Sequence, residues 1–99
     1  MILTGGENVY STEVEKVLYT HPHVLEAAVI GVPDSHWGEA VRACVVLKEG
    51  CEVMEEEIIS FCKKDLAHYK APKGVDFLKA LPKTGSGKIY KKGLRDPYL

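Results

Sequence analysis

Two apolar runs rich in β-branched residues occupy the middle of the chain and constrain its fold more than any other feature. The first extends from Val24 to Val32, and the second from Arg42 to Leu47. β-Branched side chains favour extended backbone, and the runs end at the turn signals Pro33–Asp34 and Glu49–Gly50. We therefore expect two strands that pair with each other, connected by a loop over residues 34–39.

Helical periodicity flanks these strands on both sides. Between Ser11 and His21, apolar residues recur at spacings of three and four, and Thr12 and Glu15 have the spacing of a capping box. The same periodicity recurs from Glu55 to His68, where acidic residues occupy the first turn and basic residues follow. Each segment predicts an amphipathic helix.

Shorter elements complete the pattern. Residues 2–10 predict an N-terminal hairpin with Gly5–Gly6 at the bend, Val75–Leu81 predicts a third strand, and Tyr90–Arg95 predicts a short final helix. This order predicts an α+β fold, a small two-layer domain with a three-stranded sheet, helices on one side and the N-terminal hairpin. A chain of 99 residues suits a single domain over residues 1–99.

The net charge of −1 hides a strong asymmetry along the chain. Residues 1–69 hold twelve Asp or Glu and five Lys or Arg, whereas residues 70–99 hold eight Lys or Arg and two Asp. A basic end this dense indicates either contact with an anion or a solvated surface, and charge alone favours the solvated surface. Readout of nucleic-acid bases is not supported, because only Tyr90 and Tyr98 interleave with the basic residues.

Composition narrows the setting in which the chain works. Its 45% apolar and 27% charged residues argue against disorder. No apolar run approaches the roughly 18–20 residues that cross a bilayer, and no basic-then-apolar leader follows Met1. The odd set of Cys44, Cys51 and Cys62 indicates a reducing compartment rather than disulfides or a zinc site. We expect a cytoplasmic chain without a transmembrane segment.

The segment Pro82–Ile89 has the strongest chemical character. Gly85 and Gly87 allow close backbone approach, and their amides together with the Lys88 ammonium suit an oxyanion. A Walker-type phosphate loop is excluded, because Pro82 stands where its first Gly belongs and no Ser or Thr follows the Lys. The alternative is a hairpin turn that displays surface lysines.

Other candidate residues favour structural roles. His21 and His23 lack a third ligand, so we expect them at a helix end rather than on a metal ion. Trp37 is expected to pack over the sheet edge, and Tyr69 to anchor a loop. No Ser/His/Asp or Cys/His set has a defensible spacing.

Four segments in the chain resemble, in order, the motifs of the C-terminal domain of the adenylate-forming superfamily. This superfamily includes acyl-CoA synthetases, peptide-synthetase adenylation domains and beetle luciferases. The resemblance covers nearly the full chain, and Ser11 departs from it where Pro is common. The matching segments are Gly5–Val9 with Glu13–Glu15, Pro22–Val24 with Glu26–Asp34 and Trp37–Glu39, Tyr69–Pro72, and Leu81–Ile89.

The resemblance implies two sets of functional residues. It implies that Lys88 is the adenylation lysine, bridging the substrate carboxylate and the ATP α-phosphate as an electrostatic clamp, with Gly85 and Gly87 on the phosphate side. A second set lies at the N-terminus, where the family rotates the domain so that glycine backbone lines the channel for the CoA pantetheine. That set is Gly5, Gly6 and Asn8.

The resemblance also implies partners. The chain corresponds to the lid of an ATP-dependent carboxylic acid–CoA ligase of the fatty-acid-metabolising type, without the N-terminal domain that carries the ATP loop, the acyl pocket and most of the Mg²⁺ contacts. We expect this lid to be inactive alone and to meet ATP, acyl adenylate and CoA, but no nucleic acid. Two alternatives stay open: the lid of a peptide-synthetase adenylation domain, and a non-catalytic module that binds an anionic partner. Acetylation of Lys88 would remove its charge.

Overall fold

A long antiparallel hairpin forms the centre of the domain. The computed structural model describes residues 1–99, and its strands β3 (Val24–Asp34) and β4 (Gly38–Leu47) pair along nearly their whole length. Both strands are longer than predicted, so the expected loop shrinks to a tight turn. The Asp34 carboxylate accepts the N–H groups of His36 and Trp37 at 2.8 and 2.9 Å, which satisfies the turn backbone without a longer loop.

Three short strands extend the sheet to five, where the sequence predicted three plus a separate hairpin. The hairpin β1 (Ile2–Thr4) and β2 (Glu7–Val9) joins the sheet because Thr4 pairs with Gly38 of β4. Strand β5 (Gly74–Phe77) is shorter than expected and runs parallel to β4. The strand order is β2-β1-β4-β3, with β5 beside β4. This non-local pairing has no local sequence signal.

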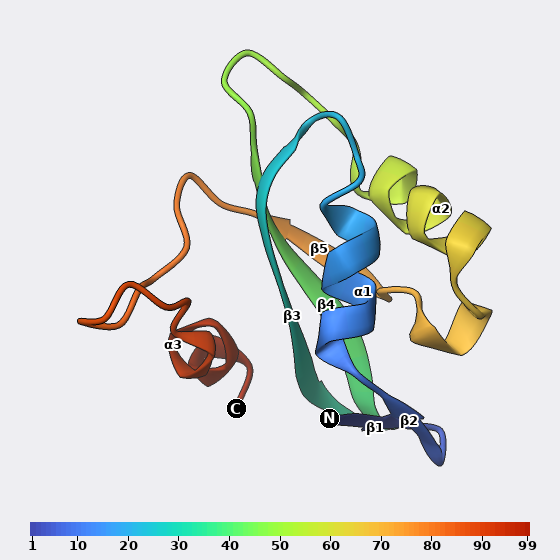
Figure 1. The fold of residues 1–99 in the computed structure, drawn as a ribbon. Helices are drawn as coiled ribbons and strands as arrows, with labels where there is room; N and C mark the ends of the chain where they lie inside the picture. The colour runs from blue at the N-terminus through green and yellow to red at the C-terminus, as the bar shows by residue number, and fades with distance from the viewer.

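Helices cover both faces of the sheet rather than one (Figure 1). Helices α1 (Ser11–Leu18) and α2 (Glu55–Asp65) share one face, and the short α3 (Lys91–Arg95) lies on the other. The α+β class is confirmed, and the one-sided arrangement is corrected. Single 3-10 turns follow α2 and α3 at His68–Lys70 and Asp96–Tyr98.

The two-sided arrangement follows from the composition of β3. A strand with one solvated face alternates apolar and polar residues, whereas β3 is apolar almost without interruption and is buried on both sides. One core lies under α1 and α2 and includes Val14, Ile58 and Val29. The second core joins Ile30 of β3 to Leu94 of α3. The prediction of helices on one side left this second face of β3 without a covering helix.

Helix α1 begins without the predicted capping box. Its N-cap residue is Tyr10 and no side chain caps it. Glu15 instead accepts the Val29 N–H at 2.9 Å and pairs with Lys91 Nζ at 2.8 Å, so it links α1 to β3 and α3. Both α1 and α2 end three residues before the predicted His21 and His68.

The three thiols are all free. Cys44 and Cys62 are buried, one in each core, and burial raises the pKa of both thiols to about 11. Cys51 is half-buried. None of the helices is both long and apolar enough to span a bilayer.

Candidate functional site

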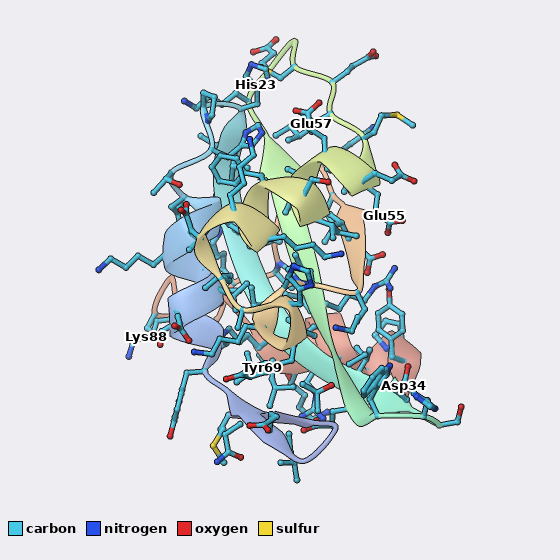
Figure 2. The ribbon with its side chains drawn as sticks, turned by 90° about the vertical axis from the view of Figure 1, so that its right-hand side faces the viewer. His23, Asp34, Glu55, Glu57, Tyr69 and Lys88 are labelled. Atoms are coloured by element: carbon cyan, nitrogen blue, oxygen red, sulfur yellow. The ribbon has the colours of Figure 1, made fainter.

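The turn Lys83–Ile89, which we call the lysine hairpin, presents Lys88 to solvent. An isolated antiparallel bridge joins its two arms, and the Thr84 N–H donates to the Lys88 carbonyl at 2.7 Å. Gly87 adopts a φ of +86°, which closes the turn. The Lys88 side chain is exposed at the margin of the domain (Figure 2). The predicted alternative of a hairpin with surface lysines therefore describes the backbone correctly.

The two glycines of the lysine hairpin differ in what they offer an anion. The Gly87 N–H donates to the Thr84 carbonyl at 2.9 Å, so it is used inside the turn. The Gly85 N–H has no acceptor within the chain, and no atom lies near the position that a Gly85 side chain would occupy. Of the two amides that the sequence assigned to an oxyanion, only that of Gly85 is available.

Lys88 differs from the other lysines of the lysine hairpin and α3, because each of those forms an ion pair. Lys88 Nζ has neither an ion-pair nor a hydrogen-bond partner. Its ammonium can therefore meet an external anion without breaking an internal contact. The paired lysines are Lys83 with Glu26 at 2.7 Å, Lys91 with Glu15 at 2.8 Å, and Lys92 with Asp96 at 3.1 Å.

The bend between β1 and β2, which we call the glycine turn, is confirmed at Gly5–Gly6. These residues have φ values of +57° and +82°, a region that side chains other than glycine rarely adopt. The Gly5 N–H donates to the Trp37 carbonyl at 2.8 Å, whereas the space around Gly6 is open. Asn8 is exposed on β2 and pairs with Leu3.

A groove that no sequence pattern predicted lies beside the glycine turn. We call it the aromatic groove because Trp37 and Tyr69 contribute two partly exposed rings. Lys73 Nζ lies 5.7 Å from the centre of the Trp37 ring, within cation–π range. Two rings beside an ammonium suit a ligand with a planar ring and negative charge. The lining residues are Thr4, Gly5, Glu7, Trp37, His68, Tyr69 and Lys73.

Asp34 fixes the wall of the aromatic groove. Its two backbone hydrogen bonds hold the turn that presents Trp37, and they lower the pKa of the Asp34 carboxyl. Trp37 lies in the turn between β3 and β4 and packs beside Gly5, and 43% of it stays exposed. The motif segments containing Trp37 and Tyr69 were the available sequence signal, although nothing local indicated that they meet.

The lysine hairpin and the glycine turn lie on opposite sides of the domain. In Figure 1 the lysine hairpin projects on the side of α3, while the glycine turn projects at the far corner beyond β4. In Figure 2 Asp34 and Tyr69 lie toward the end that carries the glycine turn. The two candidate sites of the domain are therefore separate in space.

The histidine pair is part of the packing between helices. His21 is buried, and its Nδ1 accepts the His23 N–H at 3.1 Å. Its Nε2 lies 3.5 Å from a Glu57 oxygen, and its ring packs edge-on against Phe61. Both ring nitrogens of His21 are therefore engaged within the fold. No cluster of three or more His, Cys, Asp or Glu residues lies close enough together to hold a metal ion.

The fold, the lysine hairpin and the glycine turn agree with one known family of domains. A profile of the AMP-binding enzyme C-terminal domain family matches residues 13–88. The chain belongs to this family.

Particular relatives extend the match across the whole chain. It is 50% identical to a mitochondrial medium-chain acyl-CoA ligase of Danio rerio over 97% of its own length and 16% of that protein. A fatty acyl CoA synthetase of Mycobacterium tuberculosis superposes with a TM-score of 0.91 at 49% identity, covering 99% of this chain and 19% of that one. The amide bond synthetase McbA of Marinactinospora thermotolerans gives 0.94 at 39% identity, covering 98% and 20%. The chain therefore spans about one-fifth of the proteins it matches.

Proposed function

We propose that this chain is the lysine-bearing domain of an ATP-dependent carboxylic acid–CoA ligase. The observation that carries the proposal is the state of Lys88, whose ammonium is exposed at a hairpin tip and unpaired while the neighbouring lysines are paired. The remaining four-fifths of such a ligase supplies the ATP site, the acyl pocket and the Mg²⁺ ligands in this proposal.

In the first half-reaction, a carboxylate oxygen of the acid attacks the α-phosphorus of ATP, and pyrophosphate leaves. Negative charge builds on the oxygens of the transferring group as this bond forms. Lys88 supplies a fixed positive charge at that place, and the free Gly85 amide adds a donor. No proton transfer is needed, so Lys88 acts as an electrostatic clamp.

In the second half-reaction, the CoA thiol attacks the acyl carbonyl, and AMP leaves. We assign this step to the opposite side of the domain, where Gly5, Gly6 and Asn8 line the path of the pantetheine. The adjoining aromatic groove, with its two rings and Lys73, suits the charged and aromatic end of CoA. Because the two sites lie on opposite sides, the domain must turn between the steps.

The acyl substrate is proposed as a fatty acid. Two relatives that match nearly the whole chain are named for the length of the acyl chain. They are the medium-chain acyl-CoA ligase and a long-chain-fatty-acid–CoA ligase of Mycobacterium tuberculosis, 48% identical over 99% of this chain and 19% of that protein. An amide bond synthetase shares the fold at a lower identity of 39%. CoA is therefore favoured over an amine as the acyl acceptor.

The alternative of an anion-binding module is weakened by the ion pairs. Half of the eight basic residues in the C-terminal segment are neutralised by the rest of the domain, because Lys70, Lys83, Lys91 and Arg95 pair with carboxylates of the preceding residues. A docking surface for nucleic acid would need these charges free.

Domain exchange tests the proposal. This chain replaces the matching C-terminal part of the Mycobacterium tuberculosis ligase, and pyrophosphate release from ATP and a long-chain fatty acid is measured. We expect activity from the hybrid and its loss with Lys88→Ala, whereas the ligase lacking any C-terminal part provides the baseline. A hybrid at that baseline, together with tight binding of CoA or nucleic acid by the 99-residue chain at physiological salt, would support the binding module instead.

A further inference from the structure

One ion pair ties the lysine hairpin to the sheet. Lys83 lies in the arm of the hairpin opposite Ile89, and its Nζ donates to Glu26 Oε1 at 2.7 Å. Glu26 belongs to β3, on the face of the sheet that α3 covers. The pair therefore connects the segment that carries Lys88 to a strand that pairs with β4 along nearly its whole length.

The rest of the lysine hairpin has little else to orient it. Residues 83–88 are exposed, and the other polar contacts of Thr84, Ser86 and Gly87 stay inside the turn. Leu81 and the partly buried Ile89 hold the base of the hairpin by apolar contact, which is not directional. The Lys83–Glu26 contact is the only side-chain hydrogen bond or ion pair between the hairpin and the sheet.

We infer that Glu26 and Lys83 are positioning residues for the adenylation step, acting through the direction in which the hairpin presents Lys88. The inference rests on the proposed function. A charge placed where a transition state develops charge is effective only when its geometry is fixed beforehand. Glu26 supplies that fixation from β3, at a distance from the reacting atoms.

The pair also keeps Lys83 occupied. An unpaired ammonium in the same hairpin would compete with Lys88 for the ATP phosphates and could hold them away from the reacting position. Glu26 neutralises it, so that a single ammonium of the hairpin faces the nucleotide. Because Lys83 and Glu26 are both partly exposed, the pair contributes little to global stability, so positioning and folding can be measured separately.

The test uses the complete hybrid ligase with Glu26→Gln, Lys83→Met and the exchanged pair Glu26→Lys with Lys83→Glu. We expect each single variant to lower kcat for pyrophosphate release about tenfold, with thioester formation from preformed acyl adenylate unchanged. The exchanged pair restores most of the loss, because it rebuilds the contact with opposite polarity. The control is Lys92→Met, which removes an exposed pair with Asp96 in α3 and leaves both steps unchanged.

A second measurement needs no activity. We expect hydrogen exchange at the Thr84, Gly87 and Tyr90 amides of the 99-residue chain to be faster in Glu26→Gln. In the exchanged pair it returns to the rate of the unsubstituted chain.

Two patterns overturn the inference. In the first, Lys83→Met lowers adenylation while Glu26→Gln does not and the exchanged pair fails, which would mean that Lys83 contacts the nucleotide itself. In the second, both half-reactions fall equally or exchange at the hairpin is unchanged. Lys88→Ala is measured in parallel. If this variant keeps its adenylation activity, the proposed function is wrong. If it loses that activity while the Glu26 and Lys83 variants keep theirs, only the positioning role is refuted.

Discussion

Two independent constraints favour glycine at position 5. Its φ of +57° disfavours any side chain, and a Cβ there would lie 2.8 Å from Trp37 Cε3. Gly6 has a similar backbone conformation, with φ +82°, but open space where a side chain would be. The glycine turn is therefore open at Gly6 and packs against Trp37 at Gly5.

Substitution of Gly6 tests the assignment of this turn. Gly6→Leu is expected to slow thioester formation much more than adenylation, because the side chain would enter the proposed pantetheine path. Single-turnover assays of the two half-reactions in the hybrid ligase measure the difference. Gly50→Leu is the matched control, since Gly50 has φ +79° and open surroundings, so it carries the same backbone cost of roughly 1–2 kcal/mol away from either site. Equal losses in both half-reactions would refute the assignment.

Asp76 connects β5 to the end of the chain. Arg42 donates to both Asp76 oxygens, at 2.6 and 3.0 Å, and the Tyr98 hydroxyl donates to the same carboxylate. The hydrogen bonds from Arg42, and then the one from Tyr98, hold the pKa of Asp76 below its ordinary value of 3.8. The folded chain thus binds this proton less readily than the unfolded chain.

Asp76→Asn should therefore change the acid dependence of stability. A carboxyl whose folded pKa is lowered stabilises the fold fully above its unfolded pKa, and this contribution is lost as pH falls through the folded pKa. We expect Asp76→Asn to lower the free energy of unfolding at about pH 7, with a smaller deficit near about pH 2. Urea unfolding at both pH values, with Asp65→Asn as the control, measures this. A deficit that is the same at both values would contradict the cause given.

At the scale of elements, β3 is the strand at one edge of the sheet, and side chains occupy its free edge. The Tyr19 hydroxyl bonds both the N–H and the carbonyl of Ala27, at 3.1 and 3.2 Å. The Glu15 carboxylate accepts the Val29 N–H, and Arg95 Nε donates to the Gly31 carbonyl. Helices α1 and α3 thus satisfy backbone groups that would otherwise pair with another chain.

Tyr19→Phe removes both hydrogen bonds to Ala27 and keeps the ring. We expect the free energy of unfolding to fall by about 0.5–1.5 kcal/mol, because two backbone groups of Ala27 lose their partner. Tyr10→Phe is the control, since the Tyr10 hydroxyl makes no hydrogen bond and the ring is exposed. Denaturant titration of the 99-residue chain gives the comparison, and matching losses in the two variants would contradict the role of Tyr19.

The elements that the sequence predicted well are those with a strong local signal. The long hairpin of β3 and β4 follows from β-branched residues, and α1 and α2 follow from apolar periodicity. The capping box failed because Glu15 finds better partners in Val29 and Lys91, which are distant in sequence. The attachment of β1 to the sheet also depends on a residue distant in sequence, because Thr4 of β1 pairs with Gly38 of β4.

The candidate site divides in the same way. Lys88 and the glycine turn lie in short segments whose residues form their own turns, so both turns could be predicted from the sequence. The aromatic groove requires Trp37, Tyr69 and Lys73 to meet through the packing of separate loops, which no local pattern encodes. The direction of the lysine hairpin depends on Glu26 in the same way.

For the whole molecule, folding pairs half of the basic residues of the C-terminal segment with acidic residues of the remainder. Ion pairs join the basic C-terminal segment to the acidic remainder, through Lys70 with Glu13, Lys83 with Glu26, Lys91 with Glu15, and Arg95 with Glu39. These ion pairs attach the C-terminal segment, which covers the second face of the sheet, to the rest of the domain. Lys88 is left free to act on an external anion.

The most direct test is the rate of acyl-adenylate formation by the complete ligase with Lys88→Ala. We predict a fall of about 10²–10³-fold or more in pyrophosphate release. Thioester formation from supplied acyl adenylate and the free energy of unfolding of the 99-residue chain should be almost unchanged, because the side chain is exposed and unpaired. An unchanged adenylation rate, or a loss of several kcal/mol of stability, would show that Lys88 is not an exposed electrostatic clamp.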